Sequence, residues 1–135
     1  MNAAELSGIA YVRGGRDALK DGGLDCWGFF RHARRLLGMT VPPEEVIDDS
    51  DNDGAIDERR KSPAWARLER PEPGCLVLIR RDTPGSHYHV GIVLDDCVRF
   101  AHCMASGSRI DRLDCPVFSK KIKGYYRYSG ARNGK

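Results

Sequence analysis

Short apolar segments follow one another closely in the second half of the chain, and this spacing constrains the fold more than any other feature. The segments are Leu76–Arg80, His89–Leu94, Val98–Cys103, Ser108–Leu113 and Ile122–Tyr128. Runs of this length, bounded by polar turn residues, are typical of β-strands. Connections too short to hold a crossover helix favour antiparallel pairing of consecutive strands. The sequence therefore predicts an antiparallel meander in this half.

The clearest helix signal lies upstream, over residues 24–38. Apolar residues recur there at the spacing of one helix face: Cys26, Phe29, Phe30, Ala33 and Leu37. Asp25 is a good N-cap, and Gly38 is a natural stop. A helical N-terminal part followed by an antiparallel sheet predicts an α+β fold.

Length and composition favour one soluble domain. The chain has 135 residues, which suits a single domain over 1–135, with a polar, proline-rich insertion at about 41–72. Within the insertion we expect a short helix around Ser62–Leu68. The net charge is +3, with basic and acidic residues interspersed, unlike the basic stripe of a nucleic-acid binder. No apolar run approaches the roughly 18 residues of a transmembrane helix. We expect neither nucleic acid nor membrane as a partner.

The N-terminal segment and the cysteine pattern both favour a protein that folds in a reducing cytoplasm. The N-terminal segment has no basic head and no long apolar core, so we expect synthesis in the cytoplasm without a signal peptide. The five cysteines include no C-x-x-C pair, which argues against a disulfide framework and a structural zinc site. We expect no cofactor and no metal.

Cys26 is a candidate nucleophile because it stands where the predicted helix begins. Unpaired N–H groups and the positive helix end there lower a thiol pKa and can stabilise an oxyanion. A thiolate nucleophile needs a base, usually a histidine. His89 opens one predicted strand and His102 closes the next. The alternative interpretation is an inert core cysteine and two unrelated polar positions on a half-exposed sheet.

The turn between these strands decides whether the histidines meet. A two-residue turn at Asp95-Asp96 pairs His89 directly with His102, with about 4.5–5.5 Å between their Cβ atoms. One imidazole can then take the thiol proton while the other orients it. Asp-Asp is a weaker turn signal than Asn-Gly, and a three-residue loop makes the contact diagonal.

At these residues the chain resembles the NlpC family of cell-wall cysteine peptidases. The similarity runs through the segments 11–15, 24–29, 73–78, 89–94 and 100–102. The tryptophan after Cys26, the polar insertion and the short length resemble the phage-tail branch most. The resemblance implies a papain-like α+β fold, with the N-terminal helix that carries the cysteine packed on a small antiparallel sheet.

The resemblance also implies an activity and a triad. The implied reaction is hydrolysis of an amide bond in peptidoglycan stem peptides, often between γ-D-glutamyl and a diamino acid. Cys26 corresponds to the nucleophile, His89 to the base and His102 to the third member of the triad. The implied partners are the stem peptide and other phage-tail proteins, with the protein associated with a virion tail and acting on the cell wall.

Further residues are implied on the substrate and oxyanion side. Tyr11 resembles the aromatic residue whose hydroxyl lines the oxyanion side, and Asp25 resembles an acid that helps bind substrate or caps the helix. Trp27 replaces a serine that holds the free amino end of a stem peptide in many members, which implies a changed specificity. Two more departures are Cys75 in place of aspartate after Gly74, and Ala10 in place of proline before Tyr11.

Other functions fit parts of the sequence. The same fold could serve as an antibacterial effector amidase, or as a catalytically silent structural domain of a tail tip. Asp49–Asp57 resembles the first nine positions of a calcium loop, but Arg60 stands where its bidentate glutamate belongs. A solvated acidic loop fits that stretch better.

Two last motifs have plainer interpretations. His87, His89 and His102 could form a zinc site, although a zinc site would leave Cys26 without a catalytic role. The tyrosines at 125, 126 and 128 could stack on sugars or bases near the lysines at 120, 121 and 123. At strand spacing they more simply cover the sheet.

Overall fold

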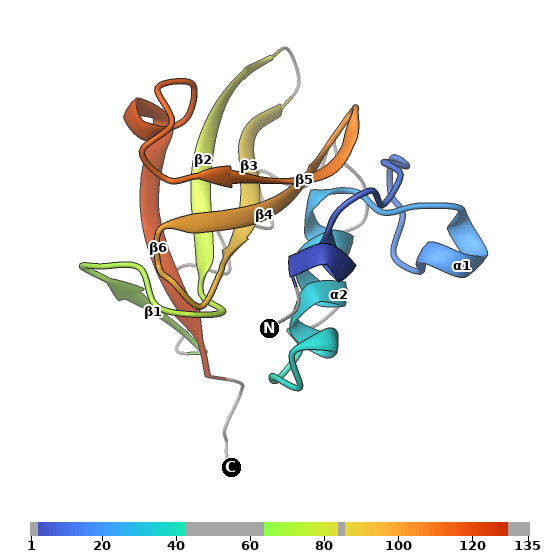
Figure 1. Ribbon diagram of the computed structural model, residues 1–135, viewed down its shortest axis with the longest axis horizontal. Coiled ribbons are helices and arrows are strands. Elements are labelled where there is room, and N and C mark those ends of the chain that lie inside the picture. The colour runs from blue at the N-terminus through green and yellow to red at the C-terminus, as the bar shows by residue number, and fades with distance from the viewer. Residues whose placement is uncertain (1–2, 43–63, 84–85, 130–135) are drawn as a thin grey trace.

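The computed structural model describes residues 3–42, 64–83 and 86–129, without the side chains at positions 3, 82, 83, 86 and 87 (Figure 1). The N-terminal part holds the 3₁₀ helix η1 (Ala3–Leu6), α1 (Ala18–Asp21) and α2 (Cys26–Leu36). The rest forms β1 (Trp65–Leu68), β2 (Leu76–Thr83), β3 (Ser86–Val93), β4 (Arg99–Met104), β5 (Gly107–Arg112), the 3₁₀ helix η2 (Ser119–Lys121) and β6 (Ile122–Tyr128). The predicted α+β fold is confirmed.

The strands form one antiparallel sheet in the order β1-β6-β2-β3-β4-β5. Strands β2 to β5 follow one another as the predicted meander, whereas β6 returns to lie between β1 and β2. Figure 1 shows β4 and β5 running across the direction of β2, β3 and β6, so the sheet is strongly twisted. In the same view α2 stands beside β3 and β4.

The predicted helix near Ser62–Leu68 is wrong, because the described part of that stretch forms β1. Trp65 pairs with Tyr128 of β6, and their rings lie 4.8 Å apart between centroids. The side chain of Trp65 is buried in the core, so cross-strand pairing overrides the weak local preference for helix. The calcium-like stretch Asp49–Asp57 lies outside the described residues.

Helix α2 begins and ends as the sequence predicts. The Asp25 carboxylate accepts a hydrogen bond from the backbone N–H of Gly28 at 2.7 Å, which caps the first turn. Gly38 takes a φ of +70° just beyond the C-terminal end, a conformation that suits glycine. In the last turn the buried Arg34 donates hydrogen bonds to three backbone carbonyl groups and thereby ties the helix to the sheet. These belong to Thr40, Gly74 and Tyr128.

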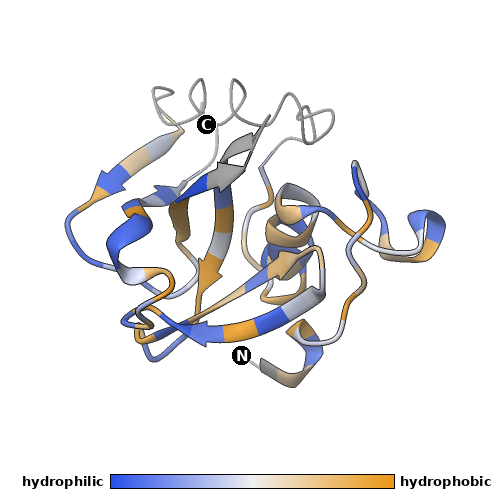
Figure 2. Ribbon diagram, turned by 90° about the horizontal axis from the view of Figure 1, so that it is seen from above, coloured by the Kyte–Doolittle hydropathy of each residue, from blue (hydrophilic) through white to orange (hydrophobic). Residues whose placement is uncertain are grey.

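The sheet has an apolar cluster on each face. One cluster lies between α2 and the sheet and includes Phe29, Phe30, Val90 and Ile92. The other lies on the opposite face, where Phe118 packs on residues such as Val93. Figure 2 shows apolar residues along α2 and the central strands, whereas the edge strand β5 is mostly hydrophilic with a single hydrophobic band. No helix among the described residues is long and apolar enough to span a membrane.

Candidate active site

Cys26 is the first residue of α2 and lies where the ladder between β3 and β4 ends. The two strands pair over three rungs, the last joining Gly91 to His102. The backbone N–H of Val90, next along β3, donates to the Cys26 sulfur. The thiol, with a residue exposure of 2%, therefore lies against the amide of the residue that follows His89.

The histidines meet diagonally, so the predicted direct pairing is wrong. The turn takes up residues 95–98, because the Leu94 N–H donates to the carbonyl of Arg99 at 2.9 Å. Cys97 adopts a φ of 58° within this turn. The longer turn shifts the register by two residues and leaves His89 and His102 on the same face. The His89 Nε2 and the His102 Nδ1 lie 2.8 Å apart in a direct hydrogen bond.

Gly91 makes room for this diagonal contact. It stands directly opposite His102 in the ladder. A Cβ atom at position 91 would lie 2.8 Å from Cδ2 of Phe100 and 3.2 Å from Cβ of His102. Because glycine lacks this atom, the His102 ring can lean across the empty position toward His89.

Asp111 on β5 extends the row of polar groups, and the sequence analysis did not identify it. The His102 Nε2 lies 2.7 Å from Oδ2 of Asp111, and the Nε of Arg109 donates to the same oxygen at 2.8 Å. The rings of Phe100 and Phe118 lie 4.5 and 5.1 Å from the His102 ring between centroids. The strand alternation of 108–113 predicts the face of Asp111, but only the observed register predicts its contact with His102.

Burial keeps the thiol protonated in the resting site. It raises the pKa of Cys26 to about 11, with a further contribution from the charge of Asp25. The Val90 amide and the charges of Arg81 and Arg16 oppose this shift without overcoming it. The predicted lowering of the Cys26 pKa is therefore wrong, because the desolvation of a buried thiolate outweighs the favourable helix end.

Burial also keeps both imidazoles neutral near pH 7. It lowers the pKa of His89 well below 6.5, and the nearby His102 and Arg81 lower it further. Burial likewise lowers the pKa of His102, although the hydrogen bond to Asp111 opposes this. The resting site thus holds a neutral thiol beside two neutral histidines, one of which can accept a proton.

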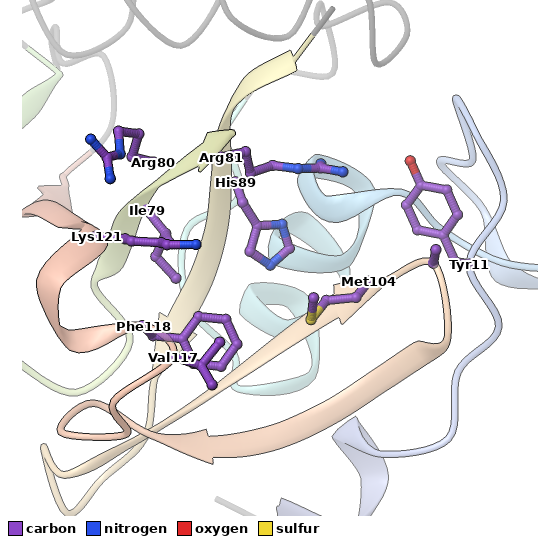
Figure 3. A pocket seen from close by; sticks show the side chains of 10 residues that line it. Tyr11, Ile79, Arg80, Arg81, His89, Met104, Val117, Phe118 and Lys121 are labelled. Atoms are coloured by element: carbon purple, nitrogen blue, oxygen red, sulfur yellow. The ribbon is translucent and has the colours of Figure 1, made fainter. Parts of the chain in front are cut away.

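A cavity of about 410 Å³ opens on the His89 side of the sheet (Figure 3). Ile79, Met104, Val117 and Phe118 contribute apolar lining. Polar side chains complete it: Tyr11, Arg80, Arg81, His89 and Lys121. The structure therefore brings Tyr11 to the cavity with His89, as the resemblance implies.

The side chains of Asp25 and Trp27 are both buried and make contacts that stabilise the fold. Asp25 is fully buried, where it caps α2 and forms an ion pair with Arg16. Trp27 has an exposure of 0% and packs on Phe30 and Trp65 in the core. The place predicted for Trp27 on the substrate side stays a prediction, although no part of the side chain is exposed. A substrate role for Asp25 stays a prediction.

The rival motifs find little support in the described residues. Among these residues, no group of three histidine, cysteine or acidic side chains is placed to hold a metal ion. The side chain of His87, the third member of the zinc hypothesis, lies outside the description. Tyr126 and Tyr128 are buried against the sheet, as their strand spacing predicts.

Comparison with known families identifies the domain. The model of the NlpC/P60 family matches residues 8–127. The chain belongs to the NlpC/P60 family. Members of this family are generally cysteine peptidases or amidases.

Solved NlpC/P60 structures share this fold. A lipoprotein-like family member from Staphylococcus aureus Mu50 superposes with a TM-score of 0.61 at 21% identity, covering 95% of this chain and 39% of its own. A family protein from Bacillus cereus gives a TM-score of 0.62 at 21% identity, with 96% and 41% covered. The chain thus spans about two fifths of these two proteins.

A third similar structure has nearly the extent of this chain. The NlpC/P60 domain of the peptidoglycan hydrolase SagA superposes with a TM-score of 0.58 at 20% identity, and 93% of this chain covers 92% of that domain. A comparison with curated proteins gave no match. At these identities the structural similarity establishes the fold alone.

Proposed function

We propose that the protein is a cysteine peptidase or amidase that hydrolyses an amide bond in peptidoglycan stem peptides. The observation that carries the proposal is the 2.8 Å contact between His89 and His102, next to the amide that holds the Cys26 thiol. Membership of a family of cysteine hydrolases supports the chemistry. The similar domain of a peptidoglycan hydrolase supports the substrate class.

In the proposed first step Cys26 attacks the amide carbonyl while His89 takes the thiol proton. Because the resting thiol is neutral, His89 must take its proton for the sulfur to act as a nucleophile. The oxyanion of the tetrahedral intermediate accepts a hydrogen bond from the backbone N–H of Cys26 at the start of α2. The Tyr11 hydroxyl at the cavity is a second donor.

The intermediate then collapses to a thioester. The carbon–nitrogen bond breaks, and the proton held by His89 passes to the leaving amine. Water, activated by His89, attacks the thioester, restores the Cys26 thiol and releases the carboxylic acid. His102 holds the base in orientation throughout through the hydrogen bond at 2.8 Å.

The setting of the activity stays a prediction. A role in a phage tail, with other tail proteins as partners, rests on the sequence resemblance. An effector amidase of the same fold and a silent structural domain are the alternatives. In each active case the protein acts on the cell wall.

Digestion of defined stem peptides tests the proposal. Synthetic tri- and tetrapeptide stems, followed by liquid chromatography and mass spectrometry, should yield two fragments that add up to substrate plus one water. Cys26→Ala and His89→Ala should lower the rate by about a thousandfold or more. His32→Ala, a change elsewhere on α2, is the matched control and should keep the rate. An inactive wild type, or an active Cys26→Ala variant, contradicts the proposal.

A further inference from the structure

The cavity beside His89 has cationic side chains and an apolar lining. Arg80, Arg81 and Lys121 contribute positive charge, and no aspartate or glutamate is among its described lining residues. In Figure 3 Lys121 extends toward His89, and Arg81 reaches from β2 across His89 toward Tyr11, whereas Arg80 points away. Two cationic side chains, Arg81 and Lys121, thus lie on either side of the proposed base in this cavity.

The charge of Arg81 lowers the pKa of both the proposed nucleophile, Cys26, and the proposed base, His89. This charge opposes the burial that raises the pKa of Cys26, and it adds to burial and His102 in lowering that of His89. Figure 3 shows the Arg81 side chain beside His89, extending toward Tyr11 along the wall of the cavity. A guanidinium is suited to hold a carboxylate through two parallel hydrogen bonds.

We propose that Arg81, with Lys121, forms a subsite for a free carboxylate on the residue next to the scissile amide. This inference rests on the proposed function and narrows its substrate to acidic stem peptides. The apolar lining, which includes Met104 and Phe118, takes the methylene chain of the same residue. The carboxylate comes from the acyl side, on a γ-linked glutamate, or from the leaving side, on a diamino acid.

Matched peptides test the subsite. Four stem peptides carry either a free carboxylate or a carboxamide at each of these two positions, and kcat/KM is measured for each. We expect amidation at one position to lower kcat/KM by about tenfold or more, and the position affected identifies the source of the carboxylate. Arg81→Gln should remove most of this preference, and Arg81→Lys should restore part of it. Arg99→Gln, which removes the same charge at the far end of the β3–β4 hairpin, should leave the preference unchanged.

The inference and the proposed function fail in different ways. Cleavage of all four peptides at rates within twofold overturns the subsite and leaves the hydrolase intact. Absence of any cleavage contradicts the proposed function, and calorimetric binding to Cys26→Ala then still tests the subsite. Tighter binding of an acid than of its amide supports it, whereas equal binding overturns it.

A second inference rests on the hydrogen bonds across β3, β4 and β5. Burial acts to raise the pKa of Asp111, but the hydrogen bonds from His102 and Arg109 lower it overall, so the group is a carboxylate at neutral pH. A carboxylate only accepts hydrogen bonds, so Nε2 of the neutral His102 must carry its hydrogen. The bare Nδ1 of His102 then accepts from Nε2–H of His89.

This order of donors leaves the Nδ1 of His89 as the atom free to take a proton. We infer that Asp111 is a positioning residue that sets the tautomer of His89 through His102. The groups that face the pair are Arg81 from β2 and Arg109 from β5, with apolar rings around the rest of His102. With the opposite tautomers, Nδ1 of His89 would carry hydrogen and could not act as a base.

Nitrogen NMR of the imidazoles tests this role without reference to activity. The wild type should show hydrogen on Nε2 of both His89 and His102. Asp111→Leu should shift His89 toward the Nδ1–H form, with kcat lowered about tenfold or more and KM little changed. Asp111→Asn keeps an acceptor oxygen and should rescue part of both effects. Unchanged tautomers in folded Asp111→Leu, or in Asp111→Ala if the leucine variant does not fold, overturn the inference.

Discussion

Replacement of Gly91 by alanine tests whether the empty position opposite His102 is needed for the site. The new Cβ would lie 2.8 Å from Cδ2 of Phe100, 2.9 Å from the carbonyl oxygen of Ala101 and 3.2 Å from Cβ of His102. The first two contacts are shorter than van der Waals packing allows, and the backbone oxygen of Ala101 cannot move without its strand. The neighbouring strand must therefore shift, and His102 with it.

The loss of stability caused by Gly91→Ala can be estimated from the overpacking that the new Cβ creates. Overpacking in a dense region costs about 1–3 kcal/mol. In a domain of 135 residues, a destabilisation of this magnitude lowers the Tm by roughly 4–12 °C, at about 4 °C per kcal/mol. The effect on the rate should be larger, because a displacement of about 1 Å in a catalytic group can cost about a hundredfold.

Gly124→Ala is the matched control in another strand of the same sheet. A Cβ there would lie 3.3 Å from atoms of Arg67 and Tyr126, and the end of the Arg67 side chain can move away. Thermal unfolding by circular dichroism and initial rates of stem-peptide cleavage give the two readouts. Gly91→Ala should lose about a hundredfold in rate while still folded, and Gly124→Ala should lose little. Equal, small losses in both variants would refute this reasoning.

Further predictions concern stability and reactivity. Arg34→Met should lower the free energy of unfolding by about 3–5 kcal/mol in denaturant titration, because two buried carbonyls and one partly buried carbonyl lose a charged donor. Asp25→Ala should cost about 2–4 kcal/mol by the same measurement, since the helix cap and the buried ion pair with Arg16 are both lost. The Tm should fall as the pH drops below 6.5, because the unfolded chain then takes up a proton at His89 that the folded chain, with its lowered pKa, does not bind. His89→Gln should reduce this slope, and an equal slope would contradict the assignment. At pH 7 iodoacetamide should modify the buried Cys26 more slowly than the partly exposed Cys97 in mass-spectrometric mapping, and its rate should climb steeply only above about pH 9, toward a pKa of about 11.

Local patterns in the sequence predicted much of the fold. The apolar spacing of 26–37, with Asp25 before it and Gly38 after it, carries nearly all the information needed to place α2. The five predicted strands match β2 to β6 to within a few residues. Short connections fix the order of a meander, so the path from β2 to β5 needs no distant information.

Features that depend on distant partners could not be predicted in this way. The four residues of β1 form a strand because Trp65 pairs with Tyr128 near the other end of the chain. The contact of the two histidines was predicted with a direct and a diagonal geometry left open, and the turn that decides between them places Cys97 at a φ of 58° that its side chain does not suggest. Asp111 lies on β5, so its contact with His102 depends on the register between β4 and β5, which the sequence alone does not give.

Detection of an acyl-enzyme on Cys26 tests the central claim most directly. Stem peptide is mixed with the protein, quenched with acid within milliseconds to seconds, and the protein is digested and mapped by mass spectrometry. The account predicts a thioester adduct, equal in mass to the acyl part of the substrate, on Cys26. The adduct should persist in Cys103→Ala, a change to the neighbouring buried thiol, and be absent in Cys26→Ala. Stem-peptide cleavage that continues in Cys26→Ala, or an adduct on another residue, would contradict it.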